Sequence, residues 1–104
     1  MDDEIALAKA VAAEALSTPG IHSLGTGQYA EAATYGLGEK VLGVVVRPEE
    51  VEVHVVVRYP LVREAGSVMG LADMVRERTA PWVGGRRVRV IVEDVFEEPE
   101  DVAV

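Results

Sequence analysis

The chain has 104 residues, with 18 acidic and 10 basic side chains, a formal net charge of −8 and no cysteine. This length fits one domain with its own hydrophobic core, and the lack of cysteine excludes a disulfide scaffold, a thiolate metal site and a thiol nucleophile. The excess of acidic residues disfavours binding to nucleic acids and anionic lipid, which bind clustered lysine and arginine. No apolar run approaches the roughly 20 residues of a membrane span. We therefore expect a cytoplasmic protein that binds no nucleic acid and does not insert directly into a membrane.

The first predicted element is a helix over residues 3–17. Its apolar residues recur at three- and four-residue steps and form one stripe, which is typical of a helix packed on a core. Acidic residues at positions 2–4 suit the positive end of the helix dipole. Pro19 cannot continue a helix, so the helix ends before it.

A short strand is predicted next, over residues 21–24. Residues 25–39 are rich in glycine and alanine and show no clear periodicity, so we expect a long loop there. Its bulky side chains include Tyr29 and Tyr35.

The middle of the chain predicts an antiparallel hairpin. Residues 41–46 form a continuous apolar run, and residues 51–59 alternate strictly, with valine at every odd position from 51 to 57. Alternation of β-branched residues indicates a strand with one buried face. The segment Pro48-Glu49-Glu50 between the two runs provides the turn.

A second helix is predicted over residues 61–80, where apolar residues again step at helical spacing. Pro81 ends it, and we expect Trp82 and Val83 to pack beneath it. Residues 86–96 alternate and predict a last strand, and residues 97–104 predict an acidic, disordered tail.

These elements predict an α+β fold, with one domain over residues 1–96. The expected order is α-(β)-β-β-α-β, in a two-layer sandwich with both helices on one face of a three- to four-stranded mixed sheet. The second helix is expected to form a crossover, which makes residues 51–59 and 86–96 parallel neighbours.

The sequence shows no pattern that predicts an active site. His22 and His54 lie on different elements without a second histidine nearby, and neighbouring acids such as Glu93 and Asp94 point to opposite faces of a strand. We interpret His54 as a solvated strand residue, with a metal ligand or a proton shuttle as the alternative. We therefore predict no catalytic residue, no metal site and no cofactor.

One face of the sheet is a candidate contact surface, because residues opposite the buried valines combine apolar and basic side chains. Arg86, Arg87 and Arg89 form the one basic cluster of the chain. The cluster is either a solvated strand face that follows a helix C-terminus or a patch for an acidic partner, such as the acidic half of a second copy. The candidate interaction residues are His54, Val56, Arg58, Arg87, Arg89 and Ile91.

The order and spacing of several segments resemble a known family. Thr18-Pro19-Gly20-Ile21 follows the first helix, Gly43-Val44-Val45-Val46 precedes the valine-rich run, and Pro81-Trp82-Val83-Gly84-Gly85 precedes the last strand. Over roughly residues 4–96, this pattern is similar to the alkaline-shock-protein family of bacterial envelope stress response proteins, in the form typical of high-GC Gram-positive bacteria.

The resemblance implies a small, non-enzymatic, cytoplasmic protein that self-assembles and takes part in cell-envelope homeostasis or in the alkaline or general stress response. It also implies a small integral membrane protein as a partner that holds the chain at the membrane, and it carries over no catalytic residue. The alternative function is a small-ligand sensor or regulatory module, in which the 25–39 loop closes over a metabolite between Tyr29 and Tyr35.

Overall fold

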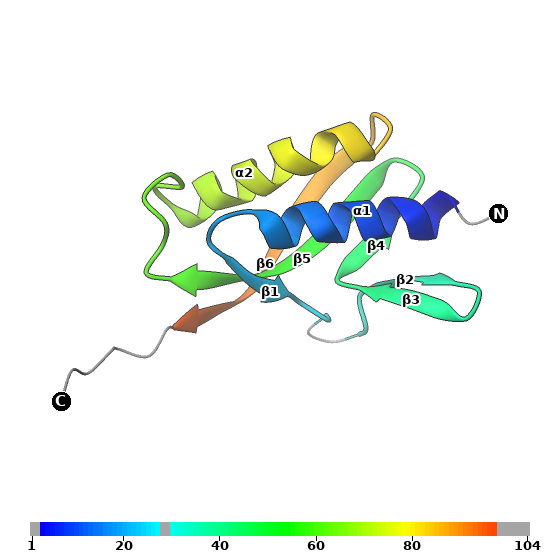
Figure 1. Cartoon of the computed structure of the whole chain (residues 1–104), viewed down its shortest axis with the longest axis horizontal. Helices are drawn as coiled ribbons and strands as arrows, with labels where there is room; N and C mark the ends of the chain where they lie inside the picture. Colours follow the sequence, from blue (N-terminus) through cyan, green and yellow to red (C-terminus); the bar gives the residue numbers. More distant parts are fainter. Residues whose placement is uncertain (1–2, 28–29, 98–104) are drawn as a thin grey trace.

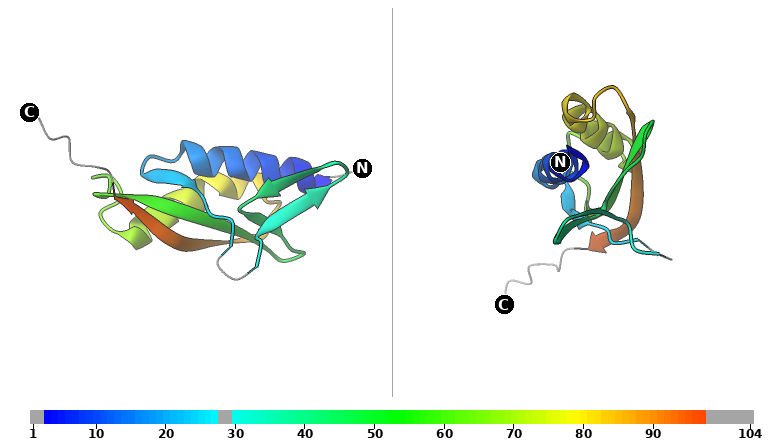
Figure 2. Two further views of the ribbon diagram at one scale, coloured as in Figure 1. Left: turned by 90° about the horizontal axis from the view of Figure 1, so that it is seen from below. Right: turned by 90° about the vertical axis from the view of Figure 1, so that its right-hand side faces the viewer.

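The computed structural model describes residues 3–27 and 30–97 of the chain. In chain order the elements are α1 (Asp3–Ser17), β1 (Ile21–Leu24), β2 (Ala33–Gly36), β3 (Glu39–Leu42), β4 (Val44–Val46), β5 (Glu50–Tyr59), α2 (Val68–Thr79), the 3-10 helix η1 (Ala80–Trp82) and β6 (Arg87–Glu97). Both α-helices lie on the same side of a four-stranded sheet (Figures 1 and 2). The predicted α+β fold is confirmed.

Strand β5 is the centre of the sheet. Along one edge it pairs in parallel with β6, from Glu50 opposite Arg87 to Tyr59 opposite Glu97. Along the other edge, β4 and β1 pair antiparallel with its first and second halves. The sheet is therefore mixed, and α2 forms the crossover between its two parallel strands.

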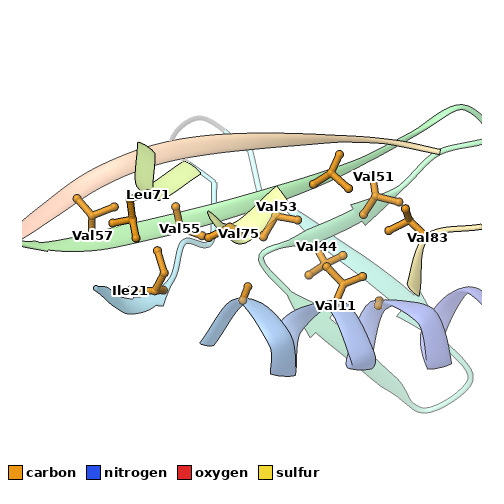
Figure 3. Close-up of a cluster of buried hydrophobic side chains, with 13 residues drawn as sticks. Val11, Ile21, Val44, Val51, Val53, Val55, Val57, Leu71, Val75 and Val83 are labelled. Atoms are coloured by element: carbon orange, nitrogen blue, oxygen red, sulfur yellow. The ribbon is translucent and has the colours of Figure 1, made fainter. Parts of the chain in front are cut away.

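The core lies between the helices and the face of β5 that carries its odd-numbered valines. Val51, Val53, Val55 and Val57 are at most 1% exposed, and they pack with residues of both helices (Figure 3). Burial of a valine side chain contributes about 1.5–3 kcal/mol to folding. This one row of side chains therefore holds both layers together.

The structure differs from the prediction in the apolar run 41–46 and in the loop before it. Gly43 has a φ of 88° and divides the run into β3 and β4. A side chain at this position would overlap Leu24 and the Gly25 carbonyl. Only β4 pairs with β5, as predicted, whereas β3 turns away and pairs with β2 in a separate two-stranded sheet. The expected 25–39 loop thus contains a strand.

Helix α2 begins later than predicted, at Val68 instead of residue 61. The Ser67 hydroxyl accepts a hydrogen bond from the Gly70 N–H at 2.9 Å and caps the helix, and Gly66 has a φ of 70°, which is not helical. Residues 61–66 therefore form no helix, and residues 63–65 form a turn, although their apolar spacing resembles that of a helix.

The prediction that Trp82 packs beneath α2 is wrong. Its side chain is 50% exposed, whereas Val83 is buried as expected. Val83, which follows η1, is the one of these two neighbours that joins the core cluster. Of the predicted tail, Glu97 is the last residue of β6, and residues 98–104 lie outside the described part of the chain.

Candidate functional site

The predicted interaction residues come together on one face of the sheet. In the parallel register of β5 and β6, His54 lies opposite Ile91, Glu52 opposite Arg89 and Glu50 opposite Arg87. Because side chains alternate between the two faces of a strand, the even positions of β5 lie on the face opposite the helices. We call this surface the outer face. Its residues from the prediction are His54, Val56 and Arg58 of β5 and Arg87, Arg89 and Ile91 of β6.

The outer face is covered unevenly. Arg87 and Arg89 at its start are exposed, whereas His54, Val56 and Ile91 are partly buried. A solvated His54 was expected, but its side chain is only 12% exposed. The arginines are therefore the most accessible of the predicted contact residues.

Two carboxylates of the outer face contact the His54 ring. Its Nδ1 lies 2.7 Å from Glu93 Oε2 and its Nε2 lies 3.3 Å from Glu52 Oε1. The second Glu52 oxygen accepts a hydrogen bond from Arg47 Nε at 3.0 Å. We call these four side chains, which come from β5, β6 and the β4–β5 turn, the outer-face network.

The chemistry of the imidazole follows from its two partners. An ionised carboxylate only accepts hydrogen bonds, so His54 donates to both Glu52 and Glu93 only when each of its ring nitrogens carries a proton. A neutral ring donates to one of them and leaves its other nitrogen facing an acceptor.

Glu52 is held in its ionised form. Its partial burial opposes ionisation, but the hydrogen bonds from Arg47 and His54 outweigh this effect and lower the pKa of the Glu52 carboxyl below its ordinary value. The network is therefore a structural ion pair cluster on the outer face.

Glu93 also holds the chain segment after β1. Its Oε2 accepts a hydrogen bond from the Gly27 N–H at 2.8 Å, and a Cβ on Gly25 would overlap its carboxylate. The register of β5 with β6 passes from Val92 directly to Asp94, so Glu93 is the extra residue of a β-bulge, a feature that re-aims a side chain. Glu93 is the residue whose role the sequence did not predict, because strand alternation gives no sign of a bulge.

An aromatic pair covers the other end of the outer face. The rings of His22 on β1 and Phe96 on β6 stack with centroids 3.9 Å apart and planes at 14°. Since β1 and β6 pair with opposite edges of β5, the two rings meet across that strand. His22 thus has a packing role.

Of the two tyrosines in the ligand-sensor hypothesis, the structure describes Tyr35. Tyr35 is 63% exposed on β2, and its hydroxyl donates to Glu31, which also accepts from Lys40. These two hydrogen bonds lower the pKa of the Glu31 carboxyl. Tyr29 lies outside the described residues.

Within residues 3–27 and 30–97, no group of three or more histidine, aspartate or glutamate side chains could hold a metal ion. The helices of that same part of the chain are too short or too polar to cross a membrane. Comparison with known proteins gave no match among family models, curated proteins or solved structures. The outer face and the open sheet edges are therefore the candidate contact surfaces of the described residues.

Proposed function

We propose that this chain is a non-enzymatic interaction protein that acts as a scaffold, by self-assembly and by binding partners. The observation that supports this function best is the parallel register of β5 with β6, which gathers residues from two distant segments on one face. The exposed arginines Arg87 and Arg89 lie at one end of it. An exposed basic cluster on an acidic protein favours acidic partners and suppresses others.

The resemblance to the alkaline-shock-protein family supports a role in the cell-envelope or the alkaline or general stress response. In this proposal the protein is cytoplasmic and forms homo-oligomers, and a small integral membrane protein is its second partner and holds it at the membrane. The contact residues are the outer-face set predicted from the sequence.

Affinity capture of the tagged protein from its own cells in mild detergent, read by mass spectrometry, tests this function. We expect a small membrane protein in near-stoichiometric amount, and less of it with the variant Arg87→Glu/Arg89→Glu. The matched control is Lys40→Glu/Arg63→Glu, which changes the net charge equally at two exposed residues outside β5 and β6. Recovery of the tagged chain alone would contradict the membrane partner, and equal loss with both variants would contradict the arginine patch.

A further inference from the structure

The outer edge of β6 is a second surface with a distinct chemistry. This strand spans Arg87–Glu97 and pairs with β5 along one edge. In the described part of the chain no strand pairs with its other edge, and Figure 2 shows β6 at the border of the sheet. A long open edge offers a row of backbone donors and acceptors to another strand.

The direction of the backbone hydrogen bonds shows which residues of β6 present their N–H and C=O groups at the open edge. The Arg87 N–H donates to the Glu49 carbonyl, toward β5. Since successive residues of a strand direct their backbone groups to opposite edges, those of Val88, Val90 and Val92 point outward. The Val88 carbonyl confirms this direction, because it accepts a hydrogen bond from Arg76 Nε. Before the bulge at Glu93, Val90 and Val92 therefore direct their backbone groups to the open edge. Beyond the bulge, the Val95 N–H already donates to the Asp94 carboxylate at 2.8 Å.

The charges of β6 are divided along its length. Arg87 and Arg89 lie in the first half, and Asp94 and Glu97 lie exposed in the second half, whereas Glu93 between them is bound to His54 and the Gly27 N–H of its own chain. A parallel copy of the strand would place like charges side by side, which is unfavourable. An antiparallel copy would bring the end of each strand that carries Arg87 and Arg89 to the end of the other that carries Asp94 and Glu97. The strand therefore complements itself in one orientation.

We propose that β6 pairs antiparallel with β6 of a second copy of the chain, around a two-fold axis near the middle of the strand. The two four-stranded sheets then join into one continuous sheet, and each interface patch is its own complement, as two-fold symmetry requires. Val95 and Phe96, which are 48% and 37% exposed, add apolar surface beside the ladder. The inference rests on the self-assembly in the proposed function and specifies its surface.

A charge-swap series tests the orientation. The variants are Arg87→Glu/Arg89→Glu, Asp94→Arg/Glu97→Arg, and the four substitutions combined. All four side chains are exposed, so the fold should persist, which far-UV circular dichroism checks. We expect each double variant to raise the dimer dissociation constant at least about tenfold in sedimentation equilibrium at low salt. The combined variant should recover most of the affinity, because the strand is complementary to itself again.

Amide hydrogen exchange provides a readout of the edge itself. In the dimer, the outward N–H groups of Val90 and Val92 should exchange more slowly than under dilution to the monomer. The N–H groups of Arg89 and Ile91, which point toward β5, should be protected in both conditions and serve as the control.

The outcomes separate the pairing from the broader function. Dimerisation without charge-swap recovery, or without protection of Val90 and Val92, would overturn the β6 pairing and leave self-assembly in place. A chain that is monomeric at all concentrations but captures its partner in the affinity experiment would overturn the pairing and leave partner binding in place. A monomeric chain that captures nothing would overturn both proposals.

Discussion

At the scale of single residues, Glu93 connects three parts of the molecule. It extends from the bulge in β6, contacts His54 of β5 and binds the backbone at Gly27. A buried carboxylate that accepts several hydrogen bonds is costly to displace, because its partners lose a charged acceptor. The conformation of residues 25–27 should therefore depend on this one side chain.

The substitution Gly25→Ala tests this dependence. The added methyl group would overlap the Glu93 carboxylate and separate it from His54 and Gly27, so we expect the free energy of unfolding to fall by about 1–3 kcal/mol. Chemical denaturation measures the change. In a Glu93→Ala background the same substitution should have little effect, since the carboxylate is already gone. Equal costs in both backgrounds would show that Gly25 acts independently of Glu93.

The lowered pKa of Glu52 predicts that the protein loses stability at acidic pH. Because its folded-state pKa lies below the ordinary value of 4.5, its ionised form stabilises the fold at every pH above that value. This contribution is lost as the pH falls through the lower folded-state pKa. The variant Glu52→Gln should therefore be less stable than the wild type near neutral pH, by about 1 kcal/mol, and the difference should shrink below pH ~4.5. Urea titrations from pH 3 to pH 7 measure it, and a constant difference over that range would refute it.

At the scale of elements, the periodicity of the sequence identified most of the secondary structure. Helix α1 and the strand pattern of β5 were predicted well, because each has one buried face along its whole length. Two of the misassigned segments depend on local backbone contacts instead. Gly43 ends one strand and begins another in the middle of an apolar run, and Ser67 begins α2 within a pattern that is helical throughout. Hydrophobic periodicity reveals neither the strand break at Gly43 nor the helix start after Ser67.

The Ser67 cap should stabilise the first turn of α2. Substitution Ser67→Ala removes the acceptor for the Gly70 N–H, and we expect it to lower the free energy of unfolding by about 1 kcal/mol. Ser17→Ala is the control, since the Ser17 hydroxyl donates to a carbonyl of its own helix at the C-terminal end of α1 and accepts only a long, exposed hydrogen bond from Arg78 at 3.4 Å, so that it caps no backbone N–H group. Thermal unfolding of both variants measures the difference. Equal melting temperatures would contradict a helix start at Val68.

At the scale of the whole molecule, the sequence predicted which faces are buried and that β5 and β6 are parallel neighbours, but not the register in which these strands pair. The odd valines of β5 face the helices as expected, and the even positions carry the candidate contact residues. The outer-face network, however, requires Glu93 to reach His54 from a strand 39 residues away in the sequence. This approach is set by the parallel register and the bulge, and alternation within one strand specifies neither.

The core joins both helices to the sheet, and this predicts that they unfold together. Leu71 of α2 is fully buried and packs with residues of α1 and β5 in one cluster (Figure 3). Leu71→Ala should therefore cost about 2–5 kcal/mol, whereas Met69→Ala on the same helix should cost less than about 0.5 kcal/mol, because Met69 is 78% exposed.

Two probes report whether this loss is shared by the whole domain. Far-UV circular dichroism follows all the elements, and the fluorescence of Trp82, the one tryptophan of the chain, follows the turn between α2 and β6. If the domain has a single core, Leu71→Ala shifts both denaturation midpoints equally, since a two-state transition is the same for every probe. A shift of the fluorescence midpoint alone would show that α2 and its turn unfold separately from α1, and the crossover helix would then be a subdomain of its own.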